Sequence, residues 1–191
     1  MRIIKSKNVI DESYTVNPLI IIIGSGIFTG FIPIASGTFG AFIGFLIFLI
    51  PGFSNYTILS ISIIIVFIIG VIASEIMQRR YGYDPPEVVI DEIVGLWFTY
   101  LVAAIVLDVF IQFKTFTPDF NFSTKIVFGL TGFFIFRLFD IIKLPPSKYF
   151  DEVKSGYGIM MDDIVSGFYA GVLSAVFSHF LWYRIFAKLL S

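Results

Sequence analysis

Long apolar runs alternate with short polar segments along this chain, and each run is long enough to form a helix. Five runs predict helices over residues 38–50, 56–74, 93–113, 126–142 and 164–187. An earlier apolar stretch, residues 18–37, is interrupted by glycines and Pro33, so it predicts a broken or re-entrant segment. A membrane span needs about 20 mainly apolar residues, and fewer where neighbouring helices shelter it. The pattern predicts an all-α, polytopic membrane helical bundle of about five spans.

The composition favours a membrane protein. The chain has 191 residues, of which 57% are hydrophobic and 14% charged, whereas globular chains carry about 25% charged residues. Residues 1–17 are more polar and predict a cytoplasmic leader before a single domain over 18–191. A net charge of −1 gives no indication of nucleic-acid binding. Apolar runs of this length also occur as buried core helices, so a water-soluble helical domain is the alternative.

The charged residues divide unequally between the two ends of the predicted spans. An up-and-down path from residue 38 places twelve of the fourteen acids on one side, together with nine of the thirteen Lys and Arg residues. The positive-inside rule assigns that side to the cytoplasm. Carboxylates are costly in hydrocarbon and gather where water or a cation can reach them. The sequence therefore predicts a polar site at the cytoplasmic surface.

Two acid pairs occur in a faint internal repeat. Each pair follows two apolar residues, precedes Ile-Val and a nearby glycine, and is expected to open a long helix. Clustered carboxylates repel one another unless a cation is present, and hard oxygen ligands suit Mg²⁺. The predicted metal ligands are Asp91, Glu92, Asp162 and Asp163, with Asp140 nearby. Acids at a helix N-terminus are also favoured by the helix dipole, so capping is the simpler alternative.

Basic and small residues near these acids suit a phosphate group. Arg137, Asp140 and Lys143 follow at steps of three, so on a helix they would share one face. Arg can bind phosphate in a bidentate manner and Lys as a point charge. Gly37 and Thr38 could bind an anion through backbone N–H groups at a helix start, with Thr38 as cap or phosphate donor. The alternatives are an interfacial row of salt bridges and close helix packing.

Absent residue types narrow the chemistry. The chain has no cysteine, which excludes thiolate nucleophiles and ligands, and its only histidine, His179, lies within the last apolar run. No Asp-x-Asp motif occurs, which argues against haloacid-dehalogenase-type chemistry. The rival class is a cation transporter or channel with a carboxylate-lined metal site. Its acids should lie in the middle of spans, whereas these acids lie at span ends.

Four blocks of the sequence resemble the phosphatidylglycerophosphatase A family and occur in the family's order. They are Gly-Thr-Phe-Gly at 37–40, Ile-Asp-Glu-Ile-Val-Gly at 90–95, Phe-Arg-Leu-Phe-Asp-Ile-Ile-Lys at 136–143, and the segment 156–167 around the second acid pair. The resemblance implies a Mg²⁺-dependent enzyme of the bacterial inner membrane that hydrolyses phosphatidylglycerol phosphate to phosphatidylglycerol and phosphate. One departure is Lys143-Leu144-Pro145-Pro146, where the family often has Lys-Pro directly.

In a Mg²⁺-dependent phosphatase, each candidate residue would have a role. Mg²⁺ would neutralise the phosphomonoester and lower the pKa of a bound water, and a carboxylate would position that water for attack. Arg137 and Lys143 would stabilise charge on the phosphoryl oxygens. An aspartyl-phosphate route stays open, and so does the oligomeric state. The expected catalytic residues are Asp91, Glu92, Asp140, Asp162 and Asp163, and the expected phosphate-binding residues are Gly37, Thr38, Arg137 and Lys143.

Overall fold

The structure is a computed structural model that describes residues 10–110 and 122–189. Every regular element in these residues is helical: α1 (Pro18–Gly24), the 3-10 helix η1 (Thr29–Phe31), α2 (Ser36–Leu49), α3 (Tyr56–Tyr81), α4 (Ile90–Phe110), α5 (Phe122–Ile142), α6 (Ser147–Asp151) and α7 (Gly156–Leu189). The predicted all-α class is confirmed. Residues 1–9 of the predicted leader and residues 111–113 of the third predicted helix lie outside the described residues.

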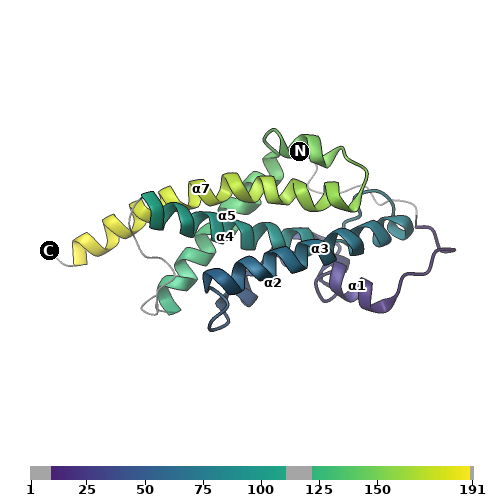
Figure 1. The fold of residues 1–191 in the computed structure, drawn as a ribbon, viewed down its shortest axis with the longest axis horizontal. Coiled ribbons are helices and arrows are strands. Elements are labelled where there is room, and N and C mark those ends of the chain that lie inside the picture. Colours follow the sequence, from purple (N-terminus) through teal and green to yellow (C-terminus); the bar gives the residue numbers. More distant parts are fainter. Residues whose placement is uncertain (1–9, 111–121, 190–191) are drawn as a thin grey trace.

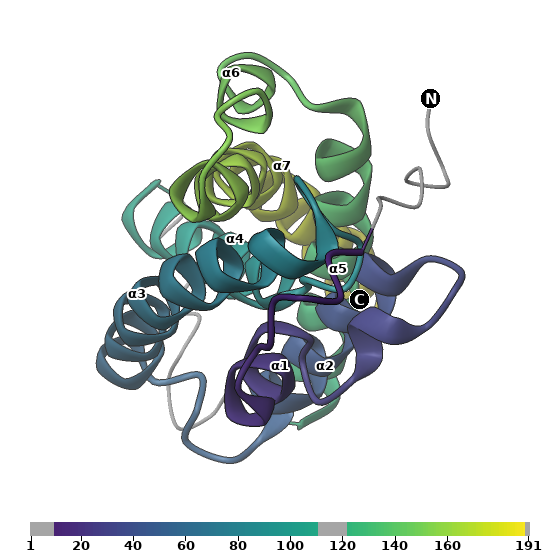
Figure 2. The same cartoon turned by 90° about the vertical axis from the view of Figure 1, so that its right-hand side faces the viewer.

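Helix α4 lies at the centre of the bundle (Figures 1 and 2). It packs most extensively against α7, while α2, α3 and α5 also contact it. Leu96, Tyr100 and Ala104 on α4 are fully buried. Glycines bring α4 and α7 close together, because a Cβ atom on Gly167 would lie 2.5 Å from the carbonyl oxygen of Gly95. Close backbone approach through small residues is a common way for apolar helices to pack.

Two aromatic side chains on α4 connect it to the helices on either side. The Trp97 indole N–H donates to the carbonyl of Gly44 on α2 at 2.9 Å, and the Tyr100 hydroxyl donates to the carbonyl of Gly129 on α5 at 2.9 Å. A buried polar group without a partner is costly, so these bonds allow large aromatic residues in the core. They fix α2 and α5 relative to the central helix.

The N-terminal apolar stretch is broken, as its glycines and proline predict. The chain leaves α1 through left-handed conformations at Gly26, Ile27 and Phe28 before η1 begins. Helix α1 packs against α3. Of the predicted leader, residues 10–17 lie along the end of α3, where the Asp11 N–H donates to the Arg80 carbonyl at 2.8 Å. Whether the broken segment re-enters a membrane stays a prediction.

Within the described parts of the chain, three helices are long and apolar enough to cross a membrane, namely Tyr56–Tyr81, Ile90–Val109 and Gly156–Phe180, and α2 is a shorter apolar helix. The predicted count of about five spans is not confirmed. Several large apolar side chains of α3 are more than half exposed: Ile61, Ile64, Ile68 and Ile72. A continuous apolar face of this kind suits lipid better than water, so the bundle fits a membrane.

Candidate active site

A cavity of about 670 Å³ lies at the end of the bundle where α4 and α7 begin and α5 ends. The segment from Gly30 to Thr38 and the loop before α4 complete its wall. All nine residues that the sequence marks as candidate site residues line it: Gly37, Thr38, Asp91, Glu92, Arg137, Asp140, Lys143, Asp162 and Asp163. Four separate segments of the chain thus meet at one site, as the one-sided distribution of acids predicts.

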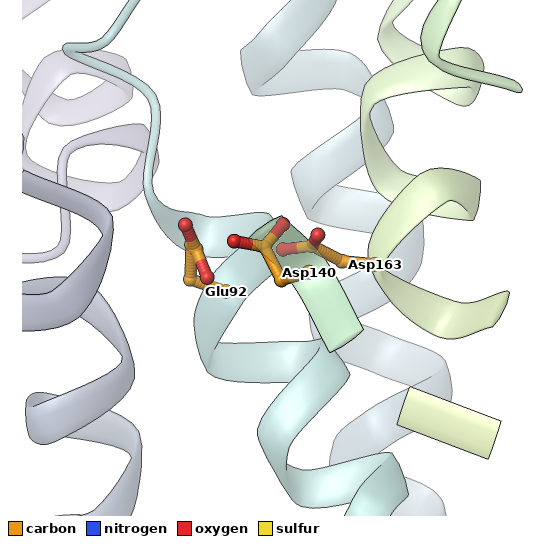
Figure 3. Close-up of side chains that lie close together, drawn as sticks. All are labelled: Glu92, Asp140 and Asp163. Atoms are coloured by element: carbon orange, nitrogen blue, oxygen red, sulfur yellow. The ribbon is translucent and has the colours of Figure 1, made fainter. Parts of the chain in front are cut away.

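Three acids from three helices form the centre of the site, which we call the three-acid cluster. Glu92 of α4, Asp140 of α5 and Asp163 of α7 each place one carboxylate oxygen within 4.8 Å of the others (Figure 3). Glu92 and Asp163 are buried, and Asp163 Oδ2 has no hydrogen-bond partner within the described part of the chain. Converging buried carboxylates are costly unless a cation neutralises them. The donor set fits a hard divalent cation such as Mg²⁺.

Local structure explains how Glu92 reaches the cluster. Helix α4 begins at Ile90, so Asp91 and Glu92 both lie in its first turn. Before it, Pro85 and Pro86 form a turn in which the Val88 N–H donates to the Pro85 carbonyl at 3.0 Å. The first turn of α2 packs against the Glu92 carboxylate, because a Cβ atom on Gly37 would lie 1.9 Å from Glu92 Oε1. Gly37 therefore supplies the space that the carboxylate occupies.

Arg137 joins two members of the three-acid cluster. Its Nη1 atom contacts Glu92 Oε2 and lies 3.1 Å from Asp140 Oδ2. The guanidinium is mostly buried, with 15% of its side chain exposed. A planar guanidinium with several N–H donors can bridge carboxylates and still present donors to a phosphate. Arg137 therefore lines the cavity beside the acids, where its other N–H donors could bind an anionic group.

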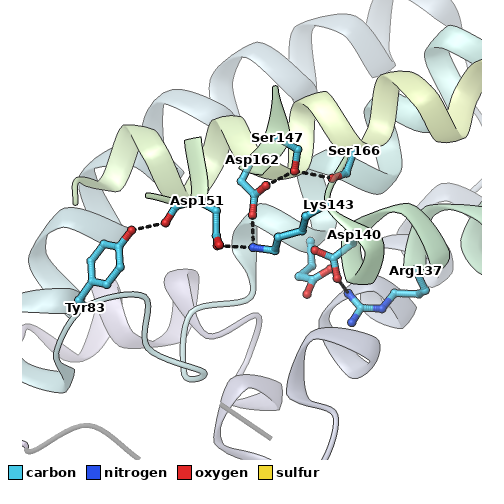
Figure 4. A network of polar contacts seen from close by, with 9 residues as sticks. Tyr83, Arg137, Asp140, Lys143, Ser147, Asp151, Asp162 and Ser166 are labelled. Atoms are coloured by element: carbon cyan, nitrogen blue, oxygen red, sulfur yellow. Dashed lines mark hydrogen bonds and ion pairs between the residues drawn. The ribbon is translucent and has the colours of Figure 1, made fainter. Parts of the chain in front are cut away.

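A second polar group, the Lys143 network, lies beside the three-acid cluster (Figure 4). The Lys143 ammonium contacts Asp162 and Asp151, and the Ser147 hydroxyl donates to Asp162. Ser147 Oγ also lies 3.2 Å from Ser166 Oγ. The four-acid metal set expected from the two pairs therefore divides in the structure. Glu92 and Asp163 converge with Asp140, while Asp162 turns toward Lys143 and Ser147.

The charge of Lys143 is stabilised by its surroundings. Burial alone would lower the pKa of this ammonium group, because desolvation disfavours the charged form. The negative charge of Asp162 and hydrogen bonds to Asp151 and Asp162 outweigh that effect and raise the pKa above its usual value. Lys143 is therefore a permanent positive charge at the edge of the cavity.

Two expectations about the end of α5 and the start of α2 are wrong. Arg137 and Lys143 do not share a helix face, since α5 ends at Ile142 and Lys143 has a left-handed φ of 50°. Pro145 and Pro146 follow shortly after the end of α5, where prolines are common because they cannot continue a helix. Thr38 is not the cap of α2, because Ala35 occupies that position and Thr38 lies within the first turn.

The second acid pair does not open its helix. Helix α7 begins at Gly156, so Asp162 and Asp163 lie almost two turns inside it. Glu75 Oε2 accepts a hydrogen bond of 2.8 Å from the Gly156 N–H, and Ser155 Oγ accepts one of 3.1 Å from the Gly158 N–H. These caps satisfy backbone groups at the start of α7 and allow it to begin early.

Sequence reasoning missed several members of the Lys143 network. Ser147 and Ser166 are buried, and Tyr83 donates from its hydroxyl to the Asp151 carbonyl. Asp151 belongs to the one-sided acids, so its position at this end was expected. A single serine has no comparable signal in the sequence, and only the packing of α6 on α7 reveals Ser147 as a partner of Asp162.

The fold and site together define a class: a helical membrane-type protein with a cavity at one end whose acids and cations suit phosphate chemistry. Comparison with known proteins gives the family. Residues 22–178 match the family model of phosphatidylglycerophosphatase A, and the chain belongs to this family.

Curated relatives agree with this assignment. A Bacteroides thetaiotaomicron protein, named as a candidate phosphatidylinositol-3-phosphatase, is 32% identical over 82% of this chain and 91% of its own. Proteins named phosphatidylglycerophosphatase A from Escherichia coli and Haemophilus influenzae are 30% and 29% identical. Both alignments cover 82% of this chain. They span 79% of the Escherichia coli protein and 86% of the Haemophilus influenzae protein. No solved structure matches the chain.

Proposed function

We propose that this protein is a Mg²⁺-dependent lipid phosphatase that hydrolyses phosphatidylglycerol phosphate to phosphatidylglycerol and inorganic phosphate. The observation that carries the proposal is the convergence of Glu92, Asp140 and Asp163, with Arg137 between two of them, in a cavity at one end of an apolar bundle. Membership of the phosphatidylglycerophosphatase A family supports a lipid phosphatase of phosphatidylglycerol synthesis.

The three-acid cluster is the proposed Mg²⁺ site. The buried Oδ2 of Asp163, which has no hydrogen-bond partner among the residues that the structure describes, is a ready ligand atom, and the carboxylates come from three different helices that fix their positions. Bound there, Mg²⁺ would neutralise a phosphomonoester and lower the pKa of a bound water. Asp91 and Asp162 line the same cavity and are the candidates to accept a proton from the attacking water.

Arg137, Lys143 and the first turn of α2 are the proposed phosphate-binding groups. Arg137 is held by Glu92 and Asp140, so its position is fixed before the substrate arrives. Gly37 and Thr38 lie at the N-terminus of a 14-residue helix, where backbone N–H groups and the helix dipole favour an anion. Preorganised donors of this kind stabilise charge that develops on phosphoryl oxygens.

The charge distribution supports a site that faces the cytoplasm of a bacterial cell. Among the described residues, most Lys and Arg residues lie at the cavity end of the bundle, and the positive-inside rule assigns that end to the cytoplasm. The same geometry disfavours the transporter alternative, because its acids should line a path through the bundle. Here Glu92 lies in the first turn of α4 and Asp140 in the last turn of α5, while Asp163 lies almost two turns inside α7 at the same end of the bundle.

Phosphate release from defined lipids tests the proposal. The full chain, purified in detergent, is given phosphatidylglycerol phosphate or phosphatidylinositol 3-phosphate in mixed micelles, with Mg²⁺ or with a chelator. We expect Mg²⁺-dependent release from the first lipid and a much smaller kcat/KM for the second. A higher kcat/KM for the inositol lipid would instead favour the substrate that appears in the name of the Bacteroides relative. No release from either lipid would refute the proposal.

A further inference from the structure

We propose that the lipid substrate reaches the cavity sideways, between the start of α2 and the end of α5. Its acyl chains would lie along apolar side chains of these two helices, which we call the α2–α5 access face: Phe39, Phe42, Phe134, Leu138 and Ile141. This inference rests on the proposed lipid substrate, and it adds the route and the surface that binds the chains.

Burial around the cavity shows which wall is accessible. The lining residues from α4 and α7 are buried, among them Asp91, Ile159 and Asp163. Tyr81, at the end of α3, is buried as well. In contrast, Ile141 of α5 lines the cavity and is 51% exposed, so the cavity reaches the apolar surface at the end of α5. The cavity is also open toward the loop before α4, where the lining residues Ile10 and Tyr83 are 39% and 36% exposed.

Apolar side chains continue from this opening along both helices. On α2 the exposed residues Phe39, Phe42 and Leu46 are spaced by three and four positions, and on α5 Phe134, Leu138 and Ile141 repeat the same spacing. Such spacing places side chains on one face of a helix. The two helices are neighbours here, since the rings of Phe42 and Phe133 lie 6.4 Å apart between centroids.

The polar site begins where the apolar face ends. Arg137 and Asp140 alternate with Leu138 and Ile141 along the last turns of α5, and Thr38 directly precedes Phe39 on α2. A ligand that fits both parts has an anionic phosphate joined to long apolar chains. A phospholipid has this construction, and its headgroup can enter the cavity while the chains remain beside the helices.

Helix α3 also has an exposed apolar face, but it does not lead to the cavity. The seam between α3 and α7 is closed near the site, because Glu75 accepts a hydrogen bond from the Gly156 N–H at 2.8 Å. A Cβ atom on Gly156 would lie 2.2 Å from the Val71 carbonyl oxygen, so the two backbones are in direct contact. The α3 face therefore provides a matched apolar control surface.

The test compares lipids of different chain length. Phe39→Gln and Leu138→Gln are assayed beside Ile68→Gln, whose residue on α3 is 56% exposed. The substrates are dioleoyl phosphatidylglycerol phosphate in vesicles and its water-soluble dibutanoyl analogue. We expect the first two variants to lose about tenfold in kcat/KM on the long-chain lipid, with a much smaller loss on the short-chain one. Ile68→Gln should match the wild type on both.

Equal losses in all three variants would overturn the access route, and so would wild-type kinetics in Phe39→Gln and Leu138→Gln. A second measurement does not depend on any variant. A substrate analogue with a diazirine on its acyl chain is photolysed with the wild-type protein, with and without excess substrate. Competed labelling within residues 31–42 and 134–142 supports the route, and competed labelling confined to α3 contradicts it. Hydrolysis of the dibutanoyl analogue separates this inference from the proposed function, which fails if neither phosphatidylglycerol phosphate nor this analogue is hydrolysed.

Discussion

Gly37 on α2 lies so close to Glu92 on α4 that a Cβ atom at Gly37 would be 1.9 Å from the Glu92 carboxylate oxygen Oε1 and 3.2 Å from Arg137 Nη1. The glycine is thus part of the site through the volume that it leaves free. Because its backbone lies within the first turn of a helix, the carboxylate has to move if a methyl group is added.

Gly37→Ala should therefore disable the enzyme without unfolding it. The added Cβ would push Glu92 out of the three-acid cluster, and we expect kcat for phosphate release to fall by about 100-fold, as a displacement of about 1 Å can cause. Ile68→Ala, on the exposed face of α3, is the control. Steady-state kinetics and the thermal unfolding midpoint are measured for both. Normal turnover in Gly37→Ala would show that the position of Glu92 is not critical.

Arg137 should be less replaceable than Lys143. The Arg137 guanidinium contacts Glu92 and Asp140 at once, and only its planar fork can also bind two phosphoryl oxygens. Lys143 contacts Asp162 and Asp151 as a point charge. We expect Arg137→Lys to lose most of kcat and Lys143→Arg to keep a substantial part, in mixed micelles at saturating Mg²⁺. A loss confined to KM in Arg137→Lys would limit the residue to ground-state binding.

Ser147 should contribute through Asp162. Its buried hydroxyl donates to the Asp162 carboxylate, so Ser147→Ala would leave a buried acid with one donor fewer. We expect a stability loss of about 1–3 kcal/mol and a reduced kcat with little change in KM. Ser174→Ala is a matched control, because Ser174 is buried and its hydroxyl has no hydrogen-bond partner within the described residues. Equal effects in both variants would mean that Ser147 only fills space.

The orientation can be tested by labelling, since the chain has no native cysteine. Glu152 follows α6 at the cavity end, and Thr57 lies at the start of α3, which ends beside the cavity. Both residues are exposed. In intact cells, a membrane-impermeant maleimide should label Thr57→Cys but reach Glu152→Cys only after permeabilisation. The reverse pattern would place the site outside the cytoplasm.

The sequence is sufficient to predict the all-α class and the end of the bundle at which the candidate residues gather, because both depend on where apolar runs stop and acids begin. It does not predict which acids pair with which cations. Asp162 and Asp163 are neighbours in sequence, yet one contacts Lys143 and the other joins Glu92 and Asp140, because adjacent residues on a helix point about 100° apart. The start of α7 depends on Glu75, 81 residues earlier, so no local pattern near Gly156 reveals it.

The central claim is that Glu92, Asp140 and Asp163 hold the Mg²⁺ used for phosphate release. The most direct measurement is a Mg²⁺ titration of phosphate release from phosphatidylglycerol phosphate by the wild type, by Asp163→Asn and by a control, Glu12→Gln, whose residue is exposed near the N-terminus. We predict that Asp163→Asn needs at least about tenfold more Mg²⁺ for half-maximal activity, or loses activity altogether, while it unfolds at a normal temperature. The control should follow the wild type. Near-normal turnover of Asp163→Asn at low Mg²⁺ would contradict the account.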